Sequence, residues 1–422
     1  AAEDFTITDD VGLGEGGQKT KYQRNVAAIR LLNEIQEQGR NATPEEQRTL
    51  ALYVGWGGLA QAFDESNDKW SKEHAELKAL LTPEEYEAAR QSTQYAHYTS
   101  REIIGGIYDG LRRMGFTGGR VLEAGGGVGN FIGLMPSDMR TSGRFTLVER
   151  ERIAAGIAKL LYPKQNVQMA DFREFGRGED GVYDAVIGNP PFGRVNLTDL
   201  SGRKHLSGLR LHNYFIAKSI DMLREGGILV NVVSNGFMDA ADTKAREYIA
   251  SRAKLIGAIR LPNDAFKGNA HTEVTTDIVI FQKLPESEWG GKEANKAARE
   301  WLSTGTVPDP NGGENIPINR YFVTNPTMML GEYGRFGSMY GPDQPALRAR
   351  PGQDTSTLIL EAVANLPEAV YESSTVQRTT NMVDAQAQKM ADMGVSEGGH
   401  FVRDGKLMQR LPDRSGEQFA RE

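Results

Sequence analysis

Short apolar runs recur along the middle of the chain and predict the strands of a sheet. The runs lie at 120–124, 145–148, 166–170, 184–188, 228–233, 255–261 and 278–283. Between several of them apolar residues recur every three or four positions, as over 103–111 and over 215–223, where Gly226-Gly227 is expected to stop the helix. Strands that alternate with helices indicate a doubly wound α/β sheet of seven strands. A loop rather than a helical pattern joins the last two runs, so we expect strand seven to be antiparallel to its neighbours.

Residues 1–95 carry a helical pattern instead. The first 18 or so are acidic and glycine-rich, so we expect a disordered or extended leader. An apolar stripe then predicts a long helix that ends at Gly39. Two further helix starts follow, at 43–46 and 82–85, each with Thr as N-cap, Pro at the first helical position and Glu at the capping-box position. This part of the chain is therefore predicted to form a leader and a helical cap.

Composition sets wide limits on the class of protein. The 422 residues are 39% hydrophobic and 25% charged, which is enough for at least one full core and two or three structural units. There is no cysteine, hence no disulfide and no thiolate metal site, and we predict no metal centre. We find no apolar run of membrane length and no signal peptide, so we expect a cytoplasmic protein without a membrane partner. The chain begins at Ala1 rather than Met, as a fragment or a processed chain would.

The turn after the first strand has the residues that a ligand-binding turn needs. Gly125, Gly127 and Gly129 follow Glu123 at short spacing, and glycine tolerates positive φ and lets the backbone come close to a bound molecule. Such a turn serves NAD, FAD or S-adenosylmethionine, and elsewhere it only packs a helix on a sheet. Glu149 ends the second strand, where a βα unit places an acid against ribose hydroxyls.

The third strand ends in an acid followed by an aromatic residue. Asp171 is able to accept a hydrogen bond from an adenine amino group, and Phe172 is able to flank the ring. The alternative role of Asp171 is to cap a helix.

The fourth strand ends in the most specific signal, Asn189-Pro190-Pro191-Phe192. Two prolines fix φ and remove two N–H donors, so the turn presents carbonyl oxygens without competing donors. An exocyclic amine is a poor nucleophile because its lone pair is delocalised into the ring. The Asn189 side chain and the Pro190 carbonyl would accept from its hydrogens and make the nitrogen more electron-rich, with no titrating base. Phe192 would stack on the base and hold it in line with a methyl donor. The alternative is a proline turn that only follows a buried strand.

These residues carry a family resemblance. Leu122 to Gly129, followed by the Asn-Pro-Pro-Phe turn, resembles the amino-methyltransferases of DNA, of the N6-adenine type whose cofactor motif precedes the catalytic one. The resemblance runs from about Tyr95 to Lys283. It implies a Rossmann-like methyltransferase domain over residues 96–285, with S-adenosylmethionine as cofactor and adenine in DNA as target.

Two further predictions of site residues rest only on this resemblance. Tyr98-Thr99-Ser100 is similar to the Tyr-Thr-Pro element that the family uses near the methionine portion of the cofactor, with Ser100 in place of proline. The loop at 263–272 resembles the element that contacts the target base from the side opposite the Asn-Pro-Pro-Phe turn. It makes Phe266 a candidate second wall of the base pocket, with burial in the core as the alternative.

The net charge and the local charge of the chain disagree on whether it binds DNA. The formal net charge is −7, whereas nucleic-acid binders usually show a basic footprint. Locally, the segment from Arg194 to His212 holds four cations, Arg194, Arg203, Lys204 and Arg210, against Asp199 alone. Because this segment directly follows the Asn-Pro-Pro-Phe turn, it is able to reach a DNA backbone. A loop that is merely solvated is the alternative.

The two ends of the chain resemble parts of larger proteins. Residues 53–59, around Trp56, and the segment near 319–332 are similar to segments of large phage and plasmid methylase–helicase proteins of the anti-restriction type. We interpret Trp56 as a core or interdomain anchor, with a base-stacking platform as the alternative. Residues 286–422 are expected to be an irregular extension without an obvious core, ending in a hairpin with an Asp-Gly turn. No nucleotide-binding Gly-x-x-x-x-Gly-Lys-Ser/Thr motif occurs, so any helicase portion or partner would lie outside this chain.

Three functions fit the sequence. The first is methyl transfer to adenine N6 in DNA, with the base flipped out of the duplex. The second is methyl transfer to a protein glutamine or an RNA base, because an Asn-Pro-Pro-aromatic turn suits any planar amide or amine. The third is a non-catalytic, methylase-like module that binds DNA or another partner. A bacterial host is expected, with a phage or plasmid origin.

Overall fold

In the computed structural model the chain forms two compact units, Ala1–Glu368 and Ala369–Glu422. The structure describes residues 2–93, 99–265, 274–337 and 341–372, and the strands at 400–403, 406–410 and 420–421. The second unit contains an antiparallel sheet of β12 (His400–Arg403), β13 (Lys406–Arg410) and β14 (Ala420–Arg421). In it Arg403 pairs with Lys406, which is the register of the predicted hairpin. The Asp-Gly turn itself lies outside the described residues.

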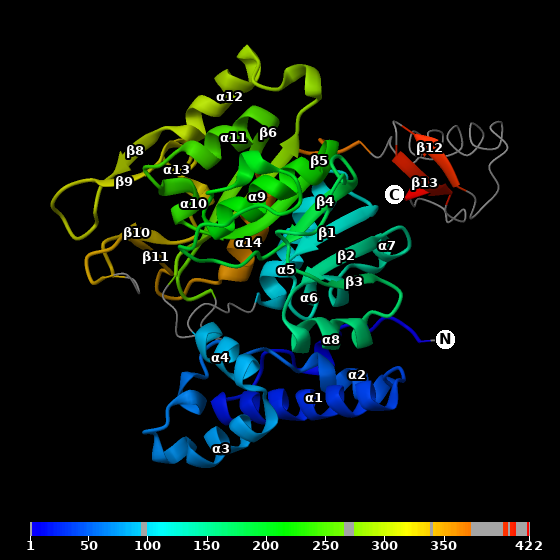
Figure 1. The fold of residues 1–422 in the computed structure, drawn as a ribbon. Helices are drawn as coiled ribbons and strands as arrows, with labels where there is room; N and C mark the ends of the chain where they lie inside the picture. The colour runs from blue at the N-terminus through cyan, green and yellow to red at the C-terminus, as the bar shows by residue number, and fades with distance from the viewer. Residues whose placement is uncertain are drawn as a thin grey trace. The chain divides into compact units, whose positions relative to one another are not determined.

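The first unit is built on a seven-stranded sheet (Figure 1). Its strands are β1 (Arg120–Ala124), β2 (Arg144–Glu149), β3 (Asn166–Met169), β4 (Tyr183–Gly188), β5 (Leu223–Ser234), β6 (Ala253–Leu261) and β7 (Thr276–Lys283). Their order is β3-β2-β1-β4-β5-β7-β6. The first five pair in parallel, and β7 is antiparallel to both β5 and β6. The predicted α/β sheet, with its antiparallel seventh strand, is confirmed.

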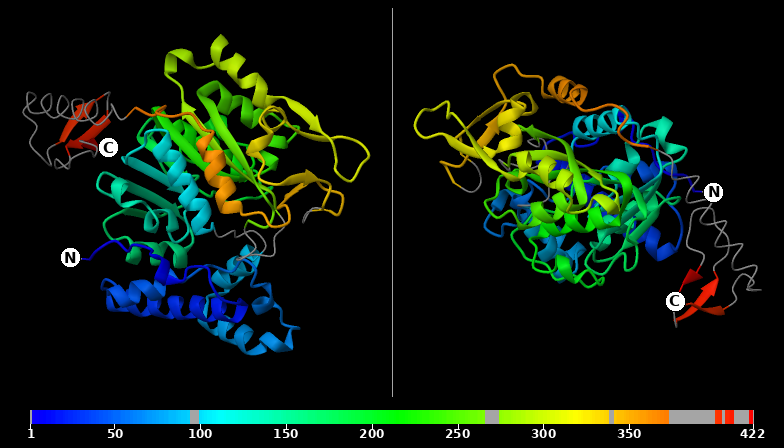
Figure 2. Two further views of the ribbon diagram at one scale, coloured as in Figure 1. Left: turned by 180° about the vertical axis from the view of Figure 1, so that it is seen from behind. Right: turned by 90° about the horizontal axis from the view of Figure 1, so that it is seen from above.

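Helices cover both faces of this sheet, which explains why β4 and β5 are almost entirely buried. On one face lie α9 (Leu211–Met222) and α11 (Lys244–Arg252); on the other lie α5 (Arg101–Arg113) and α14 (Thr355–Ala364), side by side in Figure 2. Helix α9 ends at Met222, and Gly226 lies inside β5. The predicted stop at Gly226-Gly227 is therefore wrong, because the strand begins directly after the helix.

The N-terminal helices are α1 (Gln18–Gln38), α2 (Pro44–Ala51), α3 (Ser71–Leu80) and α4 (Pro83–Ser92). Both predicted capping boxes are formed, and Gly39 ends α1 in the left-handed conformation. The leader is extended but not disordered. The amide of Phe5 donates to Leu161 and that of Ile7 to Gly133, and both side chains are buried. The apolar residues of the leader therefore anchor it despite its acidic composition.

Residues 286–368 contain more regular structure than their sequence suggested. They include α12 (Lys292–Leu302), β8 (Thr304–Val307), β9 (Ile316–Asn319), α13 (Arg320–Thr324), β10 (Glu332–Gly334), β11 (Ala346–Arg348) and α14. Arg260 on β6 is fully buried, with Asp277 at 2.7 Å and Asp239 at 2.8 Å. Asp239 also accepts from the backbone N–H of Asn319, at 2.9 Å. This buried network joins the extension to the sheet. The cap, the sheet and residues 286–368 of the extension all belong to one compact unit.

The described residues contain neither a candidate membrane-spanning helix nor a candidate metal site. None of their helices combines the length and the apolar character that a membrane crossing requires. Nor do these residues bring together three side chains of His, Cys, Asp or Glu that could hold a metal ion.

Candidate active site

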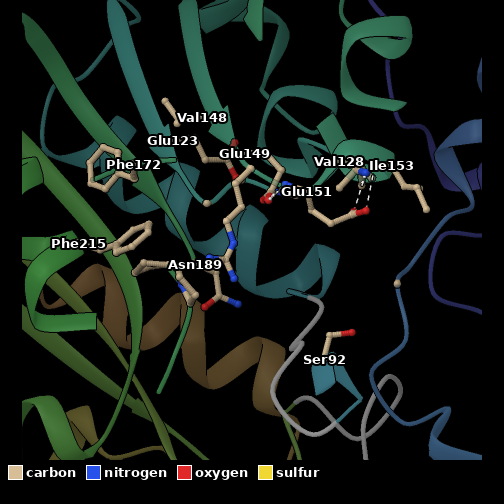
Figure 3. Close-up of a pocket in the computed structure, with 18 of the residues that line it drawn as sticks. Ser92, Glu123, Val128, Val148, Glu149, Glu151, Ile153, Phe172, Asn189 and Phe215 are labelled. Atoms are coloured by element: carbon tan, nitrogen blue, oxygen red, sulfur yellow. Dashed lines mark hydrogen bonds between the residues drawn. The ribbon is translucent and has the colours of Figure 1, made fainter. Parts of the chain in front are cut away.

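A cavity of about 430 Å³ opens at the carboxyl ends of the central strands (Figure 3). The strand order reverses between β1 and β4, and open α/β sheets bind their ligands at such a point. The cavity is lined by Gly125 and Gly127 of the glycine turn, Glu123 in β1, Glu149 at the end of β2, the Asp171-Phe172 pair and the Asn-Pro-Pro-Phe turn. Gly129 does not line it. Its size is in the range of small-molecule sites.

The glycine turn needs its glycines for two different reasons. Gly125, Gly127 and Gly129 all have positive φ. A Cβ on Gly125 would lie 2.9 Å from the Cδ of Pro191, so the glycine turn and the Asn-Pro-Pro-Phe turn pack directly against each other. Around Gly127 there is no heavy atom within 4 Å of such a position. This glycine leaves room for a ligand to approach the backbone.

Three carboxylates line the cavity: Glu123 is buried, and Glu149 and Glu151 are half-buried. Glu149 accepts from the backbone N–H of Gly127 at 3.0 Å and of Glu151 at 2.9 Å. Glu123 is 2% exposed, and its Oε2 has no hydrogen-bond partner among the described residues. Burial raises the pKa of both carboxyls, and the nearby charge of Glu149 raises the pKa of Glu123 further.

Glu151 is the third, and the sequence analysis missed it. It caps α8 (Arg152–Leu161) by accepting from the amides of Ile153 and Ala154. Burial raises its pKa as well. Glu is not among the residues that helices prefer as N-caps, so its position before an apolar helical stripe gives little signal in the sequence.

The Asp171-Phe172 pair lies at the cavity, but Asp171 is already engaged. Its carboxylate accepts from the Arg173 guanidinium at 2.8 Å and from the Arg173 amide at 2.9 Å. The hydrogen bond from Arg173 holds the pKa of Asp171 below its usual range. Phe172 is buried, with its ring centroid 4.8 Å from that of Phe215 on α9. The sequence predicts only that Phe215 belongs to the apolar face of a helix. Its spacing does not distinguish a cavity position from a core position.

Asn189 and Thr99 meet at the cavity although they are 90 positions apart in the sequence. The Asn189 Nδ2 donates to the Thr99 Oγ1 at 3.0 Å, and Thr99 is buried. The carbonyl end of the amide is thereby turned away from Thr99. Ser100, which replaces the proline of the family element, caps α5 by accepting from the amide of Ile103. Tyr98 lies outside the described residues.

Pro190, Pro191 and Phe192 line the cavity together with Asn189. Pro190 is buried, Pro191 is exposed, and Phe192 is half-buried. All four residues of the predicted catalytic turn are thus at one place. Phe266, the predicted second wall of the base pocket, lies outside the described residues.

The basic segment after this turn is folded rather than a loose solvated loop. Its two ends pair as a short β-bridge between Asn196 and Arg210. Its centre is organised by Asp199, which accepts from the Tyr214 hydroxyl at 2.6 Å and from the amide of Arg203 at 2.6 Å. Arg194 and Lys204 are exposed on this segment.

Arg203 requires a correction. Its side chain is buried and donates to Asp180 at 2.6 Å and to the carbonyl of Gly176 at 2.8 Å. A guanidinium that is buried and paired inside the protein is not placed to reach a phosphate. The predicted DNA contact of Arg203 is therefore wrong, and the side chain stabilises the segment instead.

The cap also reaches the cavity. Tyr53, Val54, Gly55 and Trp56 line it. Trp56 is 3% exposed and packs edge-on against Phe63, with ring centroids 5.5 Å apart. It is the expected core anchor, and it contributes to the cavity wall as well.

The fold and the site define a class. A sheet in this order, with an antiparallel β7 and a glycine-turn cavity at the strand ends, is the doubly wound α/β arrangement that the resemblance to methyltransferases implied. Residues 137–266 match the family described as Eco57I restriction-modification methylase. This match supports a methyltransferase function for the domain.

Two curated proteins are similar to parts of the chain. One is "Defense against restriction protein B" of Escherichia phage P1, 24% identical over 274 residues, which cover 64% of this chain and 10% of the phage protein. The other is "Type II methyltransferase M.TthHB8I" of Thermus thermophilus, 35% identical over 131 residues, which cover 28% of this chain and 29% of that enzyme. The chain therefore corresponds to less than a third of the length of either relative.

Two solved structures are similar to the chain at low sequence identity. The EcoKI M protein of a type I restriction enzyme is 14% identical with a TM-score of 0.37, and the match covers 88% of this chain and 95% of that protein. The methyltransferase subunit of a type I restriction-modification system from Streptococcus thermophilus is 14% identical with a TM-score of 0.39. This match covers 78% of this chain and 70% of that subunit.

Proposed function

We propose that the protein transfers a methyl group from S-adenosylmethionine to the N6 amino group of adenine in DNA. The observation that carries this proposal is that the Asn189–Phe192 turn and the Glu149 carboxylate line one cavity. A ligand held at the acid would therefore lie beside a target held at the turn.

The charge of the cavity supports this cofactor. Its acids, the buried Glu123 and the half-buried Glu149 and Glu151, suit a cation that carries hydroxyls. S-adenosylmethionine has a sulfonium, an ammonium and two ribose hydroxyls. The diphosphate of NAD or FAD would be repelled by the same groups. The lining also contains Arg173, which Asp171 engages, and the exposed Arg150.

Each predicted cofactor residue has a distinct role in this proposal. Glu149 would accept from the ribose hydroxyls, with its orientation fixed by two backbone amides. Glu123, with its unpartnered buried oxygen, would accept from the cationic methionine end. Thr99 would lie nearby through its bond to Asn189. Tyr98 is retained as a proposed contact on the family resemblance alone.

The catalytic turn would act by positioning and polarising the amine. S-adenosylmethionine, when bound, supplies an electrophilic methyl group. The Asn189 carbonyl oxygen and the Pro190 carbonyl would accept from the two N6 hydrogens and increase electron density on the nitrogen. Phe192 would stack on the base and keep it in line with the methyl group. The amine loses one proton to solvent after transfer, so no side-chain base is needed.

Adenine in a duplex would have to leave the base stack to reach this turn. The exposed cations Arg194 and Lys204 would hold the flanking backbone phosphates, and Phe266 is retained as the proposed second wall of the base pocket. A bacterial cytoplasmic setting, with a phage or plasmid origin and a helicase portion or partner outside this chain, is proposed from the similarity to the phage protein.

The test is transfer of labelled methyl from S-adenosylmethionine, offered in parallel to unmethylated duplex DNA, to RNA and to a glutamine-containing protein fraction. We expect label in DNA, and its loss with Asn189→Ala. Label in RNA or protein alone would assign the turn to another planar amine or amide. No label in any polymer, despite cofactor binding, would favour a non-catalytic module.

A further inference from the structure

The N-terminal helices contribute a wall of the cavity that the methyltransferase motifs do not account for. Its members come from the loop after α2 and from α4: Tyr53, Val54, Gly55, Trp56, Glu85, Ala88, Ala89 and Ser92. Ser92 is labelled in Figure 3, on α4 and apart from the strand ends that carry Glu149 and Asn189. We infer that this wall contacts the cofactor, so that the helical cap is part of the cofactor site. The inference rests on the proposed function and deepens it.

The loop of this wall is held in one conformation by a buried amide. Asn25 on α1 is fully buried. Its Nδ2 donates to the carbonyl of Gly55 at 2.6 Å, and its Oδ1 accepts from the amide of Val54 at 3.0 Å. Gly55 has a φ of 74°. A side-chain amide that satisfies both a donor and an acceptor of the same short loop fixes its path along the cavity.

The cap is also joined to α8, the helix that Glu151 caps. Arg152, the first residue of α8, lies next to the lining residue Glu151 and forms an ion pair with Glu85 on α4 at 2.6 Å. At the other end of α8, the Gln47 amide on α2 donates to the carbonyl of Leu160 at 3.0 Å. These two joints hold α4 and α2 against opposite ends of α8.

The loop and the acids line the same cavity. Tyr53 is buried, and the carboxylates of Glu151 and Glu149 are close enough to raise the pKa of its hydroxyl, in addition to the larger effect of burial. Because Glu149 is the proposed ribose acceptor, a cofactor at Glu149 would lie within reach of this loop. Both walls of the cavity would then touch one ligand.

Gly55 offers a sharp test, because a Cβ built on it meets no heavy atom within 4 Å. The added methyl of Gly55→Ala would occupy cavity space rather than collide with protein. Gly39 is a matched control: it has a φ of 62°, and it also has no heavy atom within 4 Å of a Cβ position, but it ends α1 and does not line the cavity. Both substitutions strain a left-handed residue equally, and only one touches the cofactor site.

The experiment measures binding of S-adenosylhomocysteine to the whole chain by titration calorimetry, with melting temperatures of the ligand-free variants as a measure of folding. Gly55→Ala is expected to raise the Kd about tenfold or more, equal to ~1.4 kcal/mol. Gly39→Ala is expected to lower the melting temperature similarly and to leave the Kd unchanged. Equal Kd values for both variants would overturn the inference.

A second pair of variants tests the same inference if Gly55→Ala does not fold. Ser92→Leu adds bulk to the cavity from the last turn of α4, and Gln91→Leu places the same leucine side chain on its exposed neighbour. We expect only Ser92→Leu to weaken binding, and equal binding would overturn the inference. If the unsubstituted chain binds no S-adenosylhomocysteine at all, the proposed cofactor fails, and this inference fails with it.

Discussion

The cavity and the segment after the Asn-Pro-Pro-Phe turn differ in the sign and the exposure of their charges. The cavity is lined by Glu123, Glu149 and Glu151, of which the first is buried and the other two are half-buried, and burial is the main cause that raises their pKa values. In the segment after the turn, Arg194 and Lys204 are exposed. Enclosed acids suit one small cation, whereas exposed cations suit a long polyanion.

The net charge of the whole chain combines these two regions. It is −7, which by itself argues against a nucleic-acid partner. The acids that line the cavity contribute to that total. The proposed DNA contact depends instead on the segment after the Asn-Pro-Pro-Phe turn, where Arg194 and Lys204 are exposed.

The largest expected effect lies at the boundary between the two regions. Asn189→Ala removes one of the two acceptors proposed to polarise the amine, so we expect the transfer rate to fall by roughly 10²- to 10³-fold. Binding of S-adenosylhomocysteine should change little, since Asn189 is proposed to act on the target base. Rapid-quench transfer and calorimetry on one preparation measure both. Unchanged transfer would disprove the assigned chemistry.

The next largest effect is expected in the cavity. Glu149→Gln removes the charge that would accept from the ribose, and a hydrogen bond to a charged group contributes about 1.5–3 kcal/mol. We expect the Kd for S-adenosylmethionine to rise by roughly 10- to 100-fold, with a smaller change in kcat at saturation. Glu361→Gln, on an exposed position of α14, is the control. A selective fall in kcat instead would place Glu149 at the transfer step.

In the segment after the turn the effects should be smaller and depend on salt. Arg194→Ala and Lys204→Ala are each expected to lower the slope of log K for DNA against log salt by about 1. Arg203→Ala should leave that slope unchanged and instead lower the unfolding free energy by about 1–3 kcal/mol, because it leaves buried partners unsatisfied. Salt-dependent filter binding and chemical denaturation separate the two outcomes. A changed slope for Arg203→Ala would restore it as a DNA contact.

The smallest effect concerns pH and the cavity acids. Burial favours the protonated carboxyls, so Glu123 and Glu149 ionise in the folded protein above the ordinary Glu pKa of about 4.3. As pH rises through the raised values, the ligand-free protein loses stability, because the buried groups release protons less readily than in the unfolded chain. Ionisation also attracts the sulfonium. The Kd ratio of S-adenosylhomocysteine to S-adenosylmethionine should therefore rise with pH in paired titrations, and a flat ratio would argue against acid recognition.

Local patterns predicted most of the fold. Each strand of the seven-stranded sheet lies in a segment that the sequence predicts as a strand, and the capping boxes at Thr43 and Thr82 are formed as expected. The cavity residues Glu149 and Asn189 were found because each ends a strand, and parallel strands bring their ends together at one edge of the sheet. These features depend on short stretches of sequence that specify their own structure.

Features that depend on tertiary burial were harder to predict. Arg203 and Lys204 are adjacent cations in the sequence, yet only the first is buried and paired to Asp180. Phe5 and Ile7 anchor a leader whose composition suggested disorder. Gly55 and Tyr53 line the cavity because Asn25 and α8 hold the cap there, and such long-range contacts leave no periodic signal.

The most direct test of the central claim is the identity of the methylated nucleoside. Unmethylated duplex DNA is labelled with methyl from S-adenosylmethionine, digested to nucleosides and separated by chromatography against standards. We expect label in N6-methyldeoxyadenosine. Label in a methylated deoxycytidine, with none in deoxyadenosine, would contradict the assignment of the Asn189–Phe192 turn to adenine.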